Sequence, residues 1–176
     1  GTQYIYHAPG GTVRHPVSND VMQPAPLAAE PLATRAGVDP REILANWMLK
    51  PDNPFFARAM ANRVWGQFFG RGIVHPVDDF RETNPPTNPE LLDALAADFA
   101  TNGFDLKHLM RRIMNSHLYQ LSSIPNKTNA QDTRSFSRFY RRRHSAENLH
   151  DILVQVTGVG SRYNNLRGDA RAAELW

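Results

Sequence analysis

The stretch from Asn53 to Phe80 constrains the fold most, because it contains a helix start, an apolar helix, a helix stop and a loop. Asn53 can cap a helix, and Pro54 suits a first turn, where its missing N–H would have no partner. Gly70 and Gly72 can end the helix, since glycine adopts the left-handed conformation that closes helices. Apolar residues cover most of its circumference: Phe55, Phe56, Ala59, Met60, Ala61, Val64, Trp65, Phe68 and Phe69. Such a helix is buried, so we expect it to be central to the fold.

The polar residues of this helix predict a network with the loop that follows. At about 100° per residue, Arg58 and Asn62 lie on one side of the helix. Arg63 lies on roughly the opposite side, so no single stripe is expected to face water. A buried arginine keeps its charge and needs carboxylate or carbonyl partners. The loop that follows supplies Asp78, Asp79 and Glu82, and we predict that arginines hold them in place.

The same loop also offers a candidate site. His75, Asp78 and Asp79 supply an imidazole and two carboxylates, a set that suits a hard or borderline metal or an acid/base pair. With Arg63 they are the candidate catalytic residues, and paired carboxylates are also what glycoside cleavage needs. Adjacent aspartates in loops more often serve as turn and capping groups. The structural and the chemical interpretation both remain open at this point.

The stretch from Asn53 to Phe80 closely resembles the signature of the bacterial family catalogued as domain of unknown function 1553. Thr87–Phe99, Asp105–Ser123 and Arg142–Gly158 are similar to the same family, and Tyr4–Pro16 resembles the segment that leads into the domain. The resemblance implies a large secreted or periplasmic protein of planctomycete-type bacteria, in which this domain follows a cytochrome c domain. It also implies haem c elsewhere in the parent protein and a domain that continues beyond the sequence given.

Composition limits the chemistry independently. The 176 residues contain no cysteine, which excludes disulfides, thiolate ligands, cysteine nucleophiles and a haem c attachment within this chain. Apolar runs are short, so no membrane span is expected. A net charge of +3 does not indicate nucleic acid. We expect no cofactor in this chain, and as partners we expect other domains of the same polypeptide or a separate protein.

Turn and cap signals predict a lead-in segment over residues 1–32 and a helical domain over residues 33–176. In the lead-in, Tyr4–Tyr6 and Thr12–His15 are expected to pair as a hairpin that packs on the body. Further helices are expected after caps at Asp39, Thr87 or Asn88, Asp105 and Ser145. The predicted fold is therefore mainly α: a compact multi-helix bundle around a buried central helix, with a short hairpin or extended segment at the N-terminus.

Two of these helices carry histidines. His108 and His117 would lie on opposite sides of the helix after Asp105, so they cannot share a metal. Glu147 and His150 have the spacing used in di-iron bundles, but such sites need two copies of the pattern and only one is present. In the last helix, the apolar residues are expected to point inward: Leu149, Ile152, Leu153 and Val156.

The segment from Arg134 to Arg143 interleaves five arginines with aromatic residues. This alternation can bind single-stranded nucleic acid. In a nearly neutral protein we instead expect the rings to pack and the arginines to pair with Asp93, Asp98, Glu147 or Asp151. The predicted structural polar network comprises Arg58, Asn62, Arg63, Arg142, Arg143, Glu147 and Asp151.

Two functions follow from these patterns. The first is a non-catalytic structural or interaction module of a large secreted, haem-associated protein, with a possible link to polysaccharide processing implied by the resemblance alone. The alternative is a hydrolytic or metal-dependent enzyme whose site is the loop with His75, Asp78 and Asp79. Unpaired carboxylates at an open cleft favour the enzyme, whereas arginine partners favour the module.

Overall fold

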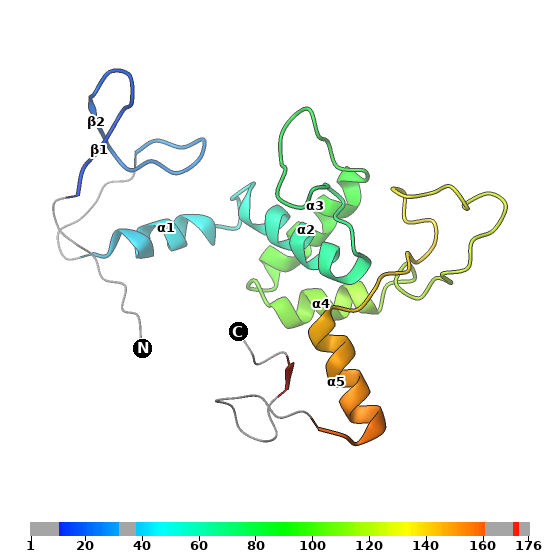
Figure 1. Cartoon of the computed structure of the whole chain (residues 1–176). Helices are drawn as coiled ribbons and strands as arrows, with labels where there is room; N and C mark the ends of the chain where they lie inside the picture. Colours follow the sequence, from blue (N-terminus) through cyan, green and yellow to red (C-terminus); the bar gives the residue numbers. More distant parts are fainter. Residues whose placement is uncertain (1–10, 32–37, 161–170, 173–176) are drawn as a thin grey trace. The chain divides into compact units, whose positions relative to one another are not determined.

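A computed structural model describes residues 11–31, 38–160 and 171–172 (Figure 1). These residues contain five helices and one two-stranded sheet, which confirms the mainly α prediction. None of these helices is long and apolar enough to cross a membrane. The chain divides into an N-terminal unit, Gly1–Gln120, and a C-terminal unit, Leu121–Trp176. The boundary predicted near residue 32 adjoins residues 32–37, which lie outside the described part.

In the hairpin, residues 13–14 pair with residues 21–22, which the sequence analysis did not assign to a strand. Strand β1 (Val13–Arg14) pairs antiparallel with β2 (Val21–Met22), with Val13 opposite Met22. The turn is closed by the amide of His15, which donates to the carbonyl of Asp20 at 2.9 Å. Residues Tyr4–Tyr6, the expected partner, lie outside the described residues.

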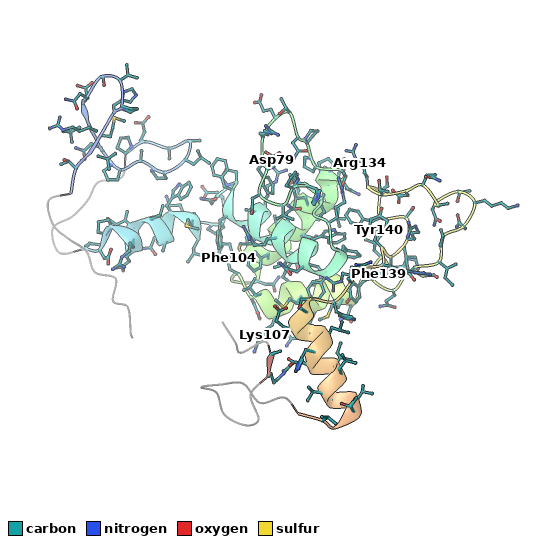
Figure 2. The ribbon with its side chains drawn as sticks, in the orientation of Figure 1. Asp79, Phe104, Lys107, Arg134, Phe139 and Tyr140 are labelled. Carbon is teal, nitrogen blue, oxygen red and sulfur yellow. The ribbon has the colours of Figure 1, made fainter. Side chains whose placement is uncertain are left out.

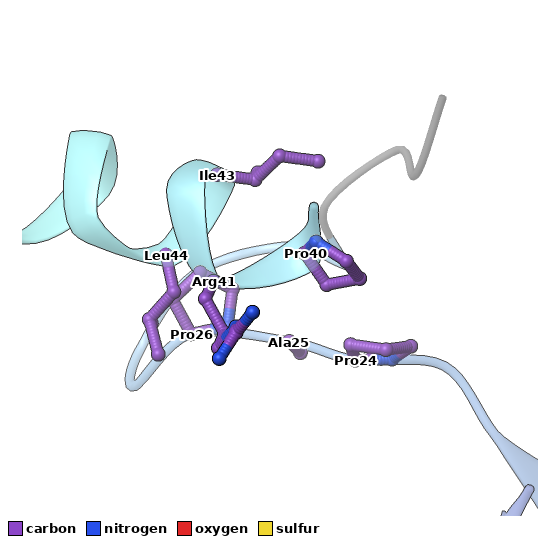
Figure 3. A pocket seen from close by; sticks show the side chains of 7 residues that line it. All are labelled: Pro24, Ala25, Pro26, Pro40, Arg41, Ile43 and Leu44. Atoms are coloured by element: carbon purple, nitrogen blue, oxygen red, sulfur yellow. The ribbon is translucent and has the colours of Figure 1, made fainter. Parts of the chain in front are cut away.

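Helix α1 (Pro40–Met48) begins where predicted, with the Asp39 side chain accepting from the Arg41 amide. It buries no residue fully. The proline-rich segment before it faces the start of α1 across an open cavity of about 270 Å³, lined by Pro24, Ala25, Pro26, Pro40, Arg41, Ile43 and Leu44 (Figure 3). Of the lead-in residues that line this cavity, Pro26 is buried, whereas the strands of the hairpin are exposed.

Helix α2 (Phe56–Phe69) begins two residues later than expected, although the Asn53 side chain accepts from the amides of Phe55 and Phe56 as a helix cap does. Gly70 ends it in the left-handed conformation at φ 73°. The expectation that no stripe faces water is wrong: Ala59, Arg63 and Gln67, spaced by four residues, are all exposed. The helix is thus central but open along one edge.

Helices α3 (Pro89–Thr101) and α4 (Leu106–Met114) both pack against α2 and against each other. Of the two candidate caps for α3, Asn88 is the one used, and Asp105 caps α4. The core of the N-terminal unit comprises Ala61, Trp65, Phe69, Ile73, Val74, Leu92, Phe99, Leu109 and Ile113, each no more than 1% exposed. Between α3 and α4, Phe104 takes a left-handed φ of 58° and its ring packs against Phe56 and Phe99 (Figure 2).

Helix α5 (Ala146–Thr157) lies in the C-terminal unit, capped by Ser145 and ended by Gly158. Its predicted apolar face does not point inward: Leu149, Ile152, Leu153 and Val156 are 49%, 40%, 54% and 79% exposed. The half-buried residues lie on roughly the opposite side of the helix, and they are Glu147, His150, Asp151 and Val154. Within the described residues, α5 therefore packs through its more polar face.

Replacing Trp65 by alanine tests the central position of α2. Trp65 is 1% exposed and stacks on Phe69 with ring centroids 4.1 Å apart. We expect Trp65→Ala to lower the free energy of unfolding by about 3 to 5 kcal/mol in chemical denaturation. Trp47 on α1 is only half-buried, so Trp47→Ala should cost clearly less. Equal losses in the two variants would contradict the assignment of Trp65 to the core.

Candidate functional site

The loop from Ile73 to Thr87 follows α2 and contains the predicted acidic site. Its main attachment is Asn62, which is 0% exposed. The Asn62 side chain accepts from the Val74 amide and donates to the carbonyls of Val74 and Val77, each at 2.9 Å. A neutral amide can satisfy donors and acceptors together, which arginine cannot. The buried polar residue that holds the loop is therefore Asn62.

Two further contacts close the loop on itself. The amide and hydroxyl of Thr87 both donate to the Ile73 carbonyl, at 2.9 and 3.1 Å. The Asn84 side chain donates to the Asp79 carbonyl at 2.9 Å. A Cβ added to Gly72 would lie 2.9 Å from the Asn62 side chain, so glycine is needed there for close packing. These contacts fix the backbone that carries the acidic residues.

Both candidate aspartates are paired with arginines. Asp78 accepts from Arg63, and Asp79 accepts from Arg81 at 2.9 Å (Asp79 is labelled in Figure 2). The Arg63 and Asp78 side chains are 53% and 67% exposed, so this pair lies at the surface. Exposed pairs contribute at most about 1 kcal/mol, because water screens them. The partners are those expected for a structural loop, but they stabilise it weakly.

The predicted metal candidates do not gather into a ligand set. Among the described residues, no group of three or more histidine, aspartate or glutamate side chains is placed to hold a metal ion. His75 is exposed, and its carbonyl accepts weakly from the Asn84 side chain at 3.3 Å. The three residues His75, Asp78 and Asp79 are thus close in sequence without forming one coordinating cluster.

A second polar cluster joins α3 to α4. Asp98, 27% exposed, lies 2.8 Å from Nε2 of His108 and 3.7 Å from Nε of Arg112. Helix α4 ends at Met114, so the prediction that His117 shares a helix with His108 is wrong.

A further ion pair joins α2 to α3. The Nε atom of Arg58 lies 3.1 Å from Oδ1 of Asp93. Asp93 and Asp98 therefore pair within the N-terminal unit, contrary to the expected pairing with the arginines of residues 134–143.

In the C-terminal unit, Asp132 organises the long polar loop that precedes α5. Its carboxylate accepts from the amides of Arg134, Ser135 and Ser137 and from the Ser137 hydroxyl. Burial raises the pKa of Asp132, but these hydrogen bonds outweigh burial and hold the pKa well below its usual range. The sequence analysis missed this role, although an aspartate followed by serines three and five residues later is a pattern for such turns.

The aromatic residues of this segment pack within the unit. Phe136 is 4% exposed, and its amide donates to the Tyr140 hydroxyl at 2.8 Å. The Phe136 and Tyr140 rings lie 5.5 Å apart, and the Arg138 guanidinium lies 5.3 Å from the centroid of the Tyr140 ring. Figure 2 labels Arg134, Phe139 and Tyr140 on this loop. Tyr140 therefore contacts both Phe136 and Arg138 within the segment.

The remaining members of the predicted network lie around α5. Glu147 sits in its first turn, where its own backbone amide and Ser145 lower the pKa of its carboxyl group. Asp151, whose side chain is 12% exposed, accepts from the Ala172 amide at 2.8 Å and from Arg171 at 3.2 Å. Arg141, Arg142 and Arg143 directly precede the helix and are all exposed. Positive charge at a helix N-terminus opposes the helix dipole, so this placement does not favour the isolated helix.

Comparison with known families decides the identity of the chain. The family model described as PSD1, Protein of unknown function (DUF1553), matches residues 40–169. The chain belongs to this family. The match includes α1 to α5, and so the acidic loop and the arginine-rich segment are both parts of the family's domain. No curated protein and no solved structure matches the chain.

Substitutions at Asn62 and Asp78 distinguish the buried attachment of the loop from the exposed one. Asn62→Leu leaves three backbone groups of Val74 and Val77 without partners, at about 1 to 3 kcal/mol each. We expect a loss of about 3 kcal/mol or more in chemical denaturation. Asp78→Ala removes only an exposed ion pair and should cost less than about 1 kcal/mol. A large loss in Asp78→Ala would show that the loop depends on the acidic residues.

Limited proteolysis tests the role of Asp132. Asp132→Ala removes four hydrogen bonds to a charged acceptor, each worth about 1.5 to 3 kcal/mol. Trypsin should then cleave after Arg134 and Arg138 at least about tenfold faster, since cleavage follows the open population. Gln131→Ala alters the adjacent exposed residue and should leave the rate unchanged. Similar rates in all three proteins would show that other contacts order the loop.

Proposed function

We propose that this domain is a non-catalytic interaction module, and that α5 is the element through which it docks. The observation that carries the proposal is the orientation of α5. Its leucine, isoleucine and valine side chains form a stripe on the exposed side, while Glu147, His150, Asp151 and Val154 are half-buried. We call Leu149, Ile152, Leu153 and Val156 the α5 stripe. Contiguous exposed apolar residues on a helix mark a surface that another protein covers.

The state of the acidic loop supports a module over an enzyme. A catalytic carboxylate needs an unobstructed approach to its substrate and a pKa suited to proton transfer. Asp78 and Asp79 instead bind Arg63 and Arg81, and the loop backbone is fixed by Asn62 and Asn84. Asn62 and Arg63 attach the loop to α2, whereas Arg81 and Asn84 bind within the loop.

The setting of the module is proposed from the family resemblance. We propose that it belongs to a large secreted or periplasmic protein with a cytochrome c domain, in which it positions neighbouring domains. The α5 stripe would then be covered in the complete protein. A role close to polysaccharide processing is consistent with that setting and is part of the same proposal.

Cysteine labelling tests whether the α5 stripe is covered. The chain has no native cysteine, so Val156→Cys places a single thiol at a position that is 79% exposed. In the isolated chain it should react with a maleimide as fast as a model thiol. In the longer protein, or with its other domains added, burial of the stripe should slow the reaction at least about tenfold, since accessibility controls thiol reactivity.

Gln155→Cys is the matched control, because Gln155 is exposed and lies about 100° from Val156 on the same helix. It should stay reactive in both contexts. Equal labelling of Val156→Cys in the isolated and the longer protein would refute the docking role of α5. Loss of labelling at both positions would indicate general shielding by a neighbouring domain and would also count against a specific docking face.

A further inference from the structure

We propose that the partner of α5 is a protein segment with an apolar centre and an acidic rim. The inference rests on the proposed docking role of α5 and adds the chemistry of the partner. It combines two features of the C-terminal unit. These are the α5 stripe and the arginines at the N-terminal end of the same helix.

The charge of this region is one-sided. Residues 121–145 contain six basic side chains, Lys127, Arg134, Arg138, Arg141, Arg142 and Arg143, against one acidic side chain, Asp132. Asp132 is fully engaged by four hydrogen bonds from its own loop. Arg141 and Arg143 carry their charges at exposed positions of this segment. An anionic surface on a partner is its natural complement.

The position of the arginines strengthens this argument. Arg141 and Arg143 are exposed and lie four and two residues before the Ser145 cap, on the side of the positive end of the α5 dipole. Charges of this sign destabilise a helix start. A carboxylate of a partner placed here would interact favourably with both the arginines and the helix N-terminus. Arginine is suited to this contact, because its planar guanidinium binds carboxylates through two hydrogen bonds.

The apolar stripe identifies the anion as part of a protein. Polysaccharides and nucleic acid backbones offer little apolar surface to Leu149, Ile152, Leu153 and Val156. Base stacking is disfavoured too, because Phe136 is buried and Tyr140 contacts both Phe136 and Arg138. A helix or groove with apolar residues flanked by Asp and Glu matches both features, in the way that amphipathic helices bind grooves.

Binding of designed peptides tests the inference. The probe is a fluorescently labelled helical peptide with leucines along one face and glutamates on its flanks, followed by anisotropy. We expect it to bind the intact chain, and binding should weaken as salt rises from about 50 to 500 mM. Arg143→Glu and Val156→Asp should each reduce the affinity by about tenfold or more. A peptide with alanines in place of leucines should bind at least about tenfold more weakly, through loss of buried apolar area.

Two controls show whether a loss of affinity in Arg143→Glu comes from lost charge pairing, from unfolding or from the change in net charge. Lys50→Glu makes the same change in charge at an exposed position of the N-terminal unit, and it should leave the affinity unchanged. A peptide with lysines in place of glutamates should bind the intact chain poorly but recover affinity for Arg143→Glu. Such a reversal requires a folded protein and a direct pairing of opposite charges.

Other outcomes overturn the inference in distinguishable ways. If heparin or an oligonucleotide binds through Arg143 without any effect of Val156→Asp, the surface is a general polyanion site. If no acidic peptide binds while Val156→Cys is still protected in the longer protein, the docking role of α5 survives and only the partner's acidic character is wrong. If Lys50→Glu weakens binding as much as Arg143→Glu, the attraction reflects net charge alone.

Discussion

The hydrogen bonds between Asn62 and the backbone of Val74 and Val77 are the constraint on which the N-terminal unit depends. They join the middle of α2 to a loop more than ten residues further along the chain. They also satisfy three backbone groups that would otherwise be buried without partners, at a cost of about 1 to 3 kcal/mol each. Ile73 and Val74, at the start of this loop, are buried in the core.

The stability of the N-terminal unit depends little on its charged contacts. The ion pairs of the acidic loop lie at the surface, where they direct the loop but stabilise it little. The charged contacts between helices, Arg58 with Asp93 and His108 with Asp98, lie at the edges of the packed helices. The energy of the unit therefore comes from its apolar core and from neutral amides, so surface charges can change without loss of the fold.

The sequence predicted those features that depend on local chemistry. Caps at Asp39, Asn88, Asp105 and Ser145 and the stop at Gly70 were recognisable, because capping involves neighbouring residues. The involvement of Asn62 followed from its place on an apolar helix, but its partners did not. Those partners are backbone groups, which every residue carries and no sequence pattern identifies.

The failures concern relations between distant segments. The pattern of α5 showed an amphipathic helix, and the default assumption that an apolar face points into the same domain was wrong. A helix that must bind a partner has the same pattern as one that packs internally. The expectation that no stripe of α2 faces water was wrong for a related reason, because spacing around a helix does not show which side a loop will leave open to water.

The contacts of Asp151 explain why α5 keeps its apolar stripe on the exposed side. Burying one such side chain completely would contribute about 1.5 to 3 kcal/mol, so a helix with this stripe turned inward would be more stable. Asp151 holds the opposite side in place by binding the Ala172 amide and Arg171, and this contact commits the more polar face to the interior of the unit. A reversal of α5 would bury the stripe but would remove Asp151 from these donors. Under the proposed docking role, this orientation exchanges intrinsic stability for a surface that a partner would cover, which is the expected compromise at a binding site.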